Sequence, residues 1–199
     1  MDEELFIYHS APVEKIPKIL KEGLTAGEET YRREMEEDLE ATASQKNISL
    51  PVKRQECVFC YPSLRQGIAM ATFDTGPPES EPTLLPRSGL LVIDARPLRD
   101  ELYVADFDFF SDVIDMRSMD EPDHAVRSES YEAALTNYAE SVTPLQTFDS
   151  IAEIDDTFRT PEVLTEVDIS PASIRETLLR KEILGTGWFS SHPALPTGK

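Results

Sequence analysis

The chain has 199 residues, of which 40% are hydrophobic and 29% are charged. This length can bury one core without a disulfide or a structural metal, and it is short for two full domains. The formal net charge of −19 repels phosphate backbones, which argues against a broad nucleic-acid-binding surface.

The acidity also has two simpler explanations. One is a solvated acidic face, and the other is a host with high internal salt, because only seven of the 19 basic residues are lysine. Salt at molar levels shrinks the Debye length to roughly 3 Å, so direct nucleic-acid binding becomes less unfavourable for a salt-adapted protein. The distribution of acidic residues over the surface distinguishes a partner-binding protein from a salt-adapted one. In a partner-binding protein the acidic residues are expected on one face, and in a salt-adapted protein they are expected to be spread evenly.

The composition predicts a single domain over residues 1–184 and a loose tail over residues 185–199. No apolar run approaches the length of a spanning helix, and the first residues lack a signal-type apolar stretch. We therefore expect a soluble cytoplasmic protein with no membrane partner.

The first element in the chain is a short strand followed by a helix. Residues 5–8 are apolar and suit a buried strand that ends at His9. Ser10 is placed to cap the helix, and Gly23 is placed to end it before Leu24 packs back.

Residues 28–53 are polar and charged, which predicts a surface helix or a mobile insertion rather than core. A buried strand is expected at 57–61 and a helix at 64–73. Proline and glycine fill residues 75–89, which indicates a loop. A strongly apolar strand at 90–94 follows.

The second half of the chain predicts three ordered elements. Residues 102–105 suit a short strand, and residues 128–142 have the spacing of a helix. Between them, residues 106–123 are acidic and aromatic and are expected to be irregular. A last strand is expected at 162–167.

Cys57 and Cys60 form a single CxxC pair. A structural zinc site needs four ligands, and neither a second pair nor a histidine at ligand spacing is found, so we expect no metal. A redox-active pair is one alternative. On a strand, however, this spacing places the two sulfurs on opposite faces, which favours two buried structural thiols.

Three segments, in this order, resemble the ADP-ribosyltransferase-like fold. They are YHSAPVEKIPKILKEGL (8–24), CVFCYPSLRQGIAMA (57–71) and TPEVLTEVDISPASI (160–174). The families include poly- and mono-ADP-ribosyltransferases, DNA-targeting ADP-ribosyltransferase toxins and RNA 2′-phosphotransferases. The resemblance implies an α+β fold with a split, mostly antiparallel β-sheet and flanking helices, with NAD as substrate.

The resemblance also implies roles for individual residues. Glu162 matches the catalytic carboxylate, which would stabilise the positive charge that develops on the ribose. His9 matches the residue that holds the adenine-side ribose, and the backbone of Ser10 would meet the nicotinamide amide. Each has a simpler reading, His9 as a structural histidine and Glu162 as a surface carboxylate.

The aromatic position is less well matched. Phe59 stands where the families usually have tyrosine, and Tyr61 lies two residues later on the same strand face. Either ring would stack on nicotinamide or belong to the core. Arg65 is a candidate for holding the pyrophosphate, or a surface charge on its helix.

Three functions stay open. The first is an enzyme of the glycosyltransferase class that transfers ADP-ribose from NAD to an unknown macromolecule, or hydrolyses NAD. The second is a non-catalytic module that binds an NAD-like ligand on the same fold. The third is an acidic interaction protein that antagonises a basic or nucleic-acid-binding partner. The chain contains neither GxxxxGK[ST] nor GxGxxG, which argues against a P-loop and against a Rossmann site.

Overall fold

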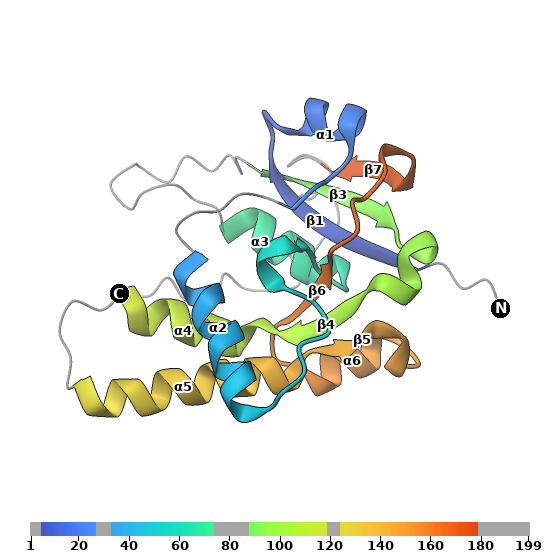
Figure 1. Cartoon of the computed structure of the whole chain (residues 1–199). Coiled ribbons are helices and arrows are strands. Elements are labelled where there is room, and N and C mark those ends of the chain that lie inside the picture. The colour runs from blue at the N-terminus through green and yellow to red at the C-terminus, as the bar shows by residue number, and fades with distance from the viewer. Residues whose placement is uncertain (1–4, 27–32, 74–87, 119–123, 179–199) are drawn as a thin grey trace.

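The computed structural model describes residues 5–26, 33–73, 88–118 and 124–178 (Figure 1). The strands are β1 (Phe6–Pro12), β2 (Val58–Cys60), β3 (Ser88–Asp94), β4 (Tyr103–Asp106), β5 (Thr143–Pro144), β6 (Pro161–Thr165) and β7 (Ile174–Leu178). The α-helices are α1 (Ile16–Glu22), α2 (Arg33–Lys46), α3 (Leu64–Phe73), α4 (Phe107–Ser118), α5 (His124–Ser141) and α6 (Ile151–Thr157). Short 3-10 helices are η1 (Arg54–Glu56), η2 (Arg96–Glu101), η3 (Leu145–Thr147) and η4 (Pro171–Ser173). Most of the loop expected at 75–89, and all of the tail at 185–199, lie outside the described residues.

The strands form two antiparallel sheets. One has the order β1-β3-β7 and the other the order β2-β6-β4-β5. The sheets meet where β1 reaches the end of β2: the Tyr8 N–H donates to the Tyr61 carbonyl at 2.9 Å, and the Tyr61 N–H donates to the Tyr8 carbonyl at 2.7 Å. The expected α+β class with antiparallel strand pairing is therefore confirmed.

The turn after α1 is built as its sequence predicts, but the start of the helix is not. β1 continues through Ser10, so this serine does not cap a helix, and α1 begins late with a proline in its first turn. Gly23 ends α1 with a φ of 92°, and its N–H donates to the Ile19 carbonyl. A Cβ at Gly23 would lie 2.4 Å from the Ile169 carbonyl oxygen, so only glycine allows Leu24 to pair there.

The polar stretch at 28–53 contains α2, and this helix has a core face, contrary to expectation. Met35, Leu39 and Ala43 recur every four residues, and all three are buried in the cluster that also holds α5. Asp38 ties the outer side of α2 to α5, because it accepts a hydrogen bond from the Tyr131 hydroxyl at 2.8 Å.

The expectation of irregular structure at 106–123 is wrong over most of its length. α4 occupies residues 107–118, with Phe110 and Val113 fully buried. Its apolar residues are spaced three apart, but the acidic residues between them hid the helical pattern. The helix expected at 128–142 is confirmed as most of α5, which begins four residues earlier.

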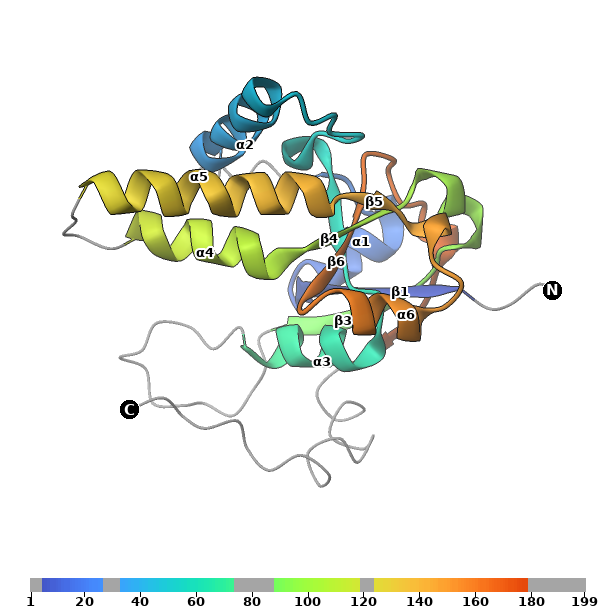
Figure 2. The same ribbon diagram turned by 90° about the horizontal axis from the view of Figure 1, so that it is seen from below.

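Two apolar clusters lie on opposite faces of the four-stranded sheet. Val163 of β6 points into the first cluster, which draws residues from both sheets, and the neighbouring Leu164 points into the second. The second cluster lies under α2, α4 and α5, which Figure 2 shows on the side of the molecule away from α3. In the part of the chain that the structure describes, no helix is long and apolar enough to cross a membrane.

Candidate functional site

A hollow of the described surface has a volume of about 1160 Å³, slightly above the ~300–1,000 Å³ typical of small-molecule sites. Its wall is formed by the end of β1, by α1 and the turn after it, by the start of α2, and by the chain from η1 into β2. His9, Ser10 and Phe59 line this pocket, as does Glu36 of α2. Three of the six predicted site residues therefore share one cavity.

His9 is half-buried and fixed by the neighbouring strand. Its Nδ1 lies 2.7 Å from the Phe59 carbonyl oxygen. Burial lowers the pKa of the imidazole, and the hydrogen bond to Phe59 offsets only part of that effect. Because a carbonyl oxygen can only accept, Nδ1 carries the proton, so the neutral ring keeps Nε2 as a hydrogen-bond acceptor.

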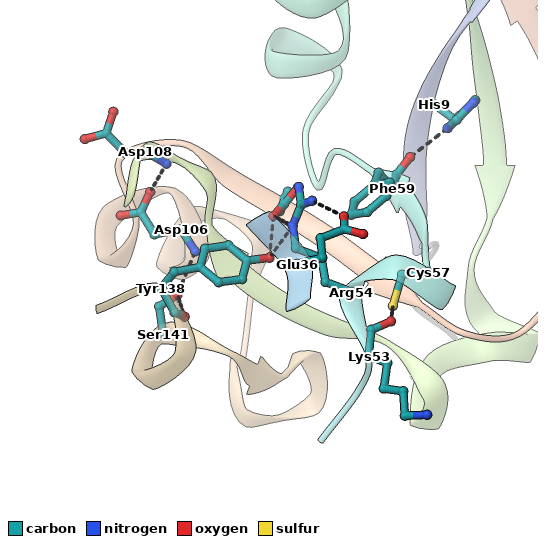
Figure 3. A network of polar contacts seen from close by, with 11 residues as sticks. His9, Glu36, Lys53, Arg54, Cys57, Phe59, Asp106, Asp108, Tyr138 and Ser141 are labelled. Atoms are coloured by element: carbon teal, nitrogen blue, oxygen red, sulfur yellow. Dashed lines mark hydrogen bonds and ion pairs between the residues drawn. The ribbon is translucent and has the colours of Figure 1, made fainter. Parts of the chain in front are cut away.

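Phe59 lies between His9 and a buried arginine (Figure 3). Its carbonyl accepts from His9, while its ring lies 4.4 Å from the guanidinium carbon of Arg54. On another side the same guanidinium carbon is 3.9 Å from the Phe110 ring centre. The two aromatic rings therefore hold the Arg54 guanidinium by cation–π contacts.

Glu162 lies at the start of β6 and is buried, with a side-chain exposure of 5%. Its Oε2 accepts from Arg54 at 3.2 Å, and its Oε1 accepts from the Tyr138 hydroxyl at 2.6 Å. Arg54 Nε also donates to the Tyr138 hydroxyl, at 3.0 Å. Glu162 is not among the residues that line the pocket.

Glu36 forms the pocket side of the same network. Its Oε1 accepts from Arg54 Nη1 at 2.9 Å, and its side chain is 8% exposed. We call Glu36, Arg54, Tyr138 and Glu162 the Arg54 cluster. Burial acts to lower the pKa of Arg54, but Glu162, Tyr138 and Glu36 outweigh it, so the pKa is raised and the guanidinium stays charged.

The Arg54 cluster brings two buried carboxylates, Glu36 and Glu162, to one buried guanidinium. A buried charge is costly unless it is paired and hydrogen-bonded, so removing Arg54 would leave both carboxylates without this partner.

A second group, the Asp94 cluster, has the opposite proportion, with two arginines on one carboxylate. Asp94 accepts from Arg96 and Arg175, at 2.6 Å from each Nη2. The carboxylate is buried, while the two arginines are 47% and 54% exposed. The hydrogen bonds from Arg96 and then Arg175 hold the pKa of Asp94 well below its usual range.

Asp106 places Glu162 in its strand. Its carboxylate accepts from the backbone N–H groups of Arg159 and Thr160, each at 3.0 Å, and from that of Asp108 at 3.2 Å. These bonds fix the turn that leads into β6. The direction of the Glu162 side chain is thus set by the backbone two residues upstream.

Tyr61 and Arg65, like Glu162, are predicted site residues that do not line the pocket. Tyr61 joins the two sheets through its backbone. Arg65 is exposed on α3, which lies on the opposite side of the molecule from α2 (Figure 2). A pyrophosphate in the pocket would therefore meet other cations, such as Lys15 and Lys18 in the α1 wall.

The two cysteines are free and buried, as expected of structural thiols. Cys57 is in the cluster under α2, and Cys60 is in the cluster between the sheets, so they lie on opposite faces. Burial, and then Glu166, raises the pKa of Cys57 to about 12, which leaves its thiol protonated near neutral pH. In the described ranges, no three histidine, cysteine or acidic side chains are grouped to hold a metal ion.

The sequence did not point to Glu36 or Arg54, and it indicated Tyr138 only as a packing residue. The one signal for Glu36 is its place next to Met35 in the four-residue repeat of the buried face of α2. A buried arginine has no sequence pattern that separates it from an exposed one, so nothing marked Arg54.

Comparison of the chain with known proteins identified no relative. No protein-family model, curated protein or solved structure matches the chain. What the pocket does must therefore be inferred from its own residues.

Proposed function

We propose that the chain transfers ADP-ribose from NAD to a macromolecule, or hydrolyses NAD, in the pocket between β1, α1, α2 and β2. The observation that carries the proposal is the set of neighbouring strands that puts His9, Ser10 and Phe59 in one pocket wall, with Glu162 paired to the arginine that lies on the Phe59 ring. Cleavage of the nicotinamide–ribose bond develops positive charge on the ribose, and fixed negative charge stabilises it.

The reaction balances as a substitution at the ribose C1′ carbon. The bond from C1′ to the nicotinamide nitrogen breaks, and its electron pair neutralises the cationic ring, which leaves as nicotinamide. An acceptor hydroxyl or amine, or water, forms the new bond to C1′ and releases its proton to a nearby base or to solvent. Glu162 is the carboxylate whose charge this reaction uses.

The arrangement of strands supports the family resemblance. β2 lies between β6 and the end of β1, so the strands that carry His9, Phe59 and Glu162 are neighbours. The N–H-bearing Nδ1 of His9 is occupied, which leaves Nε2 to accept a hydrogen bond from a ribose hydroxyl. Phe59 offers an apolar contact in the pocket wall.

The test measures NAD binding by calorimetry and nicotinamide release by chromatography, at low and at molar salt because of the acidic composition. We expect Glu162→Gln to lower nicotinamide release at least about 100-fold while NAD affinity changes little. Glu176→Gln, an exposed carboxylate of the other sheet, is the matched control and should leave both unchanged. Failure of the unaltered chain to bind NAD would overturn the proposal.

One observation favours a second candidate, a non-catalytic module that binds an NAD-like ligand. Glu162 has both carboxylate oxygens occupied by Arg54 and Tyr138, and it does not line the pocket. Under this alternative the unaltered chain binds NAD but releases no nicotinamide. The same two measurements therefore separate the candidates.

A further inference from the structure

The side of α1 that faces the pocket carries two lysines. Four residues of this segment line the pocket and recur at i, i+3, i+4 and i+7, which places them on one side of a helix: Lys15, Lys18, Ile19 and Glu22. Lys15 directly precedes α1 and has helical backbone angles, so it continues the same row. The two lysine side chains are therefore neighbours on one wall of the pocket.

α1 is fixed at both ends, so this row of side chains has a defined place. At the start, the Lys15 N–H donates to the Pro12 carbonyl at the end of β1, at 2.9 Å, and Ile16 is buried in the first apolar cluster. At the other end, Leu24 and Ile169 exchange two backbone hydrogen bonds of 2.9 Å each. The lysines are thus held between β1 and the segment that follows β6.

Other parts of the pocket wall carry carboxylates. Glu56 of η1 lines the pocket, as do Glu166 and Asp168 in the segment after β6. Glu166 is held in place, because its Oε1 accepts from the Lys53 N–H at 2.6 Å. Carboxylates repel an anionic group and lysines attract it, so the anionic part of a ligand is expected along α1.

The cations of the pocket wall differ in their contacts. Lys18 pairs with Glu22 at 3.8 Å, and Arg33 at the start of α2 pairs with Glu37 at 3.2 Å. Lys15 forms no ion pair within the described ranges of the chain, although acidic residues outnumber basic ones by 38 to 19. The ammonium group of Lys15 is therefore the one on α1 whose charge no neighbouring carboxylate offsets.

We propose that Lys15 and Lys18 hold the diphosphate of NAD, with Lys15 as the stronger contact. This inference rests on the proposed function, and it fixes the direction of the ligand by placing its anionic centre along α1. An ammonium group binds phosphate oxygens as a point charge through its N–H donors. The diphosphate is thereby assigned to α1 rather than to Arg65, which does not line the pocket.

The first test measures the affinity for ADP by calorimetry, at low and at molar salt. We expect Lys15→Gln to weaken ADP binding about five- to tenfold at low salt, the size of one charge contact near a protein surface. The loss should shrink at molar salt, where charges are screened within roughly 3 Å. Lys15→Arg, which keeps the charge, should restore most of the affinity.

A second variant should act in the opposite direction. Glu22→Gln removes the carboxylate that pairs with Lys18 and lines the pocket, so ADP should bind about two- to threefold more tightly. Damage to the fold weakens binding and cannot produce this gain. Lys21→Gln is the matched control, because Lys21 is on the same helix and does not line the pocket. If Lys21→Gln weakens ADP binding as much as Lys15→Gln, only the overall charge matters and the inference is wrong.

Steady-state kinetics of nicotinamide release gives a further reading. The diphosphate keeps its charge while the bond to nicotinamide breaks, so its contacts stabilise the bound substrate and the transition state alike. Lys15→Gln should therefore raise KM for NAD about five- to tenfold and change kcat less than about twofold. Thermal unfolding of each variant shows whether it is folded.

The results separate this inference from the proposed function. If ADP binds in a Lys15-dependent way but no nicotinamide is released from NAD, the inference stands and the non-catalytic module replaces the transferase. If NAD is consumed and Lys15→Gln leaves KM and ADP affinity unchanged, the inference is wrong and the proposed function stands. If the unaltered chain binds neither ADP nor NAD, both proposals fail.

Discussion

The Arg54 cluster and the Asp94 cluster use the same chemistry in opposite proportions. The first surrounds one buried arginine with two buried carboxylates, and the second surrounds one buried carboxylate with two half-exposed arginines. Solvent reaches the two arginines of the Asp94 cluster and screens their ion pairs. The members of the Arg54 cluster are all buried, so the loss of one partner leaves a charge inside the protein without it.

Among the substitutions that test this comparison, Arg54→Met should lower the stability of the protein most. It leaves Glu36 and Glu162 buried without their cation, so we expect a loss of about 3–5 kcal/mol in the free energy of unfolding. Arg96→Met is the matched control, because this arginine is 47% exposed and should cost less than about 1 kcal/mol. Urea denaturation measures both, and equal losses would show that the two clusters do not differ in kind.

A smaller change removes one oxygen from the Arg54 cluster. Tyr138→Phe takes away the donor to Glu162 and the acceptor for Arg54 Nε, which should cost about 1–3 kcal/mol. Tyr131→Phe removes a half-buried hydroxyl from the outer side of α5 and is the control for loss of a tyrosine oxygen. We expect nicotinamide release to fall in the first variant more than in the second. An unchanged urea midpoint for Tyr138→Phe would contradict a role for its hydroxyl in holding Glu162.

The dependence of stability on pH tests the contribution of the Asp94 cluster. The arginines lower the pKa of Asp94 in the folded state, so its stabilising effect is fully present above the ordinary pKa of 3.8 and is lost as the pH falls below it. Asp94→Asn should therefore cost about 1–2 kcal/mol at neutral pH, with the loss shrinking in strong acid. Unfolding measured at both pH values tests this, and a loss that is the same at both would argue against the charge of Asp94 as its source.

The smallest expected effect concerns ligand binding rather than folding. Because the pKa of His9 lies below the ordinary 6.5, Nε2 stays an acceptor at neutral pH and is protonated only as the pH falls below that value. NAD affinity should be constant from about pH 7 to 8 and should drop about three- to tenfold in acid, the size of one hydrogen bond. His9→Phe should remove this pH dependence. If the variant keeps it, another group is responsible.

The sequence predicted the strands better than the site. Alternating or continuous apolar runs marked β2, β3 and β4, and the phrase around Glu162 marked β6, because sheet residues leave a local pattern. The site depends on contacts between distant segments: Arg54, Tyr138 and Glu162 are 24 to 108 positions apart. No local pattern encodes such contacts.

The two missed helices have a common cause. α2 and α4 carry many acidic residues, so their average composition is that of a surface or an irregular segment. Their buried faces are narrow, as Met35 and Leu39 show in α2 and Phe110 and Val113 show in α4. A search for spacing rather than for mean polarity would have found both, and with α2 it would have brought Glu36 into consideration.

The junction of the two sheets is held by little main-chain bonding. Among the described residues, the main-chain hydrogen bonds between β1 and the end of β2 are the reciprocal pair of Tyr8 and Tyr61, and the His9 side chain adds one to the Phe59 carbonyl. By contrast, seven residues of β1 are paired along β3. Slow exchange of backbone protons with solvent should therefore persist along β1 and β3, and the Tyr61 amide should exchange sooner than the amides paired with β3. His9 and Phe59 lie directly beside this junction, so occupancy of the pocket should be detectable as added protection at that one amide.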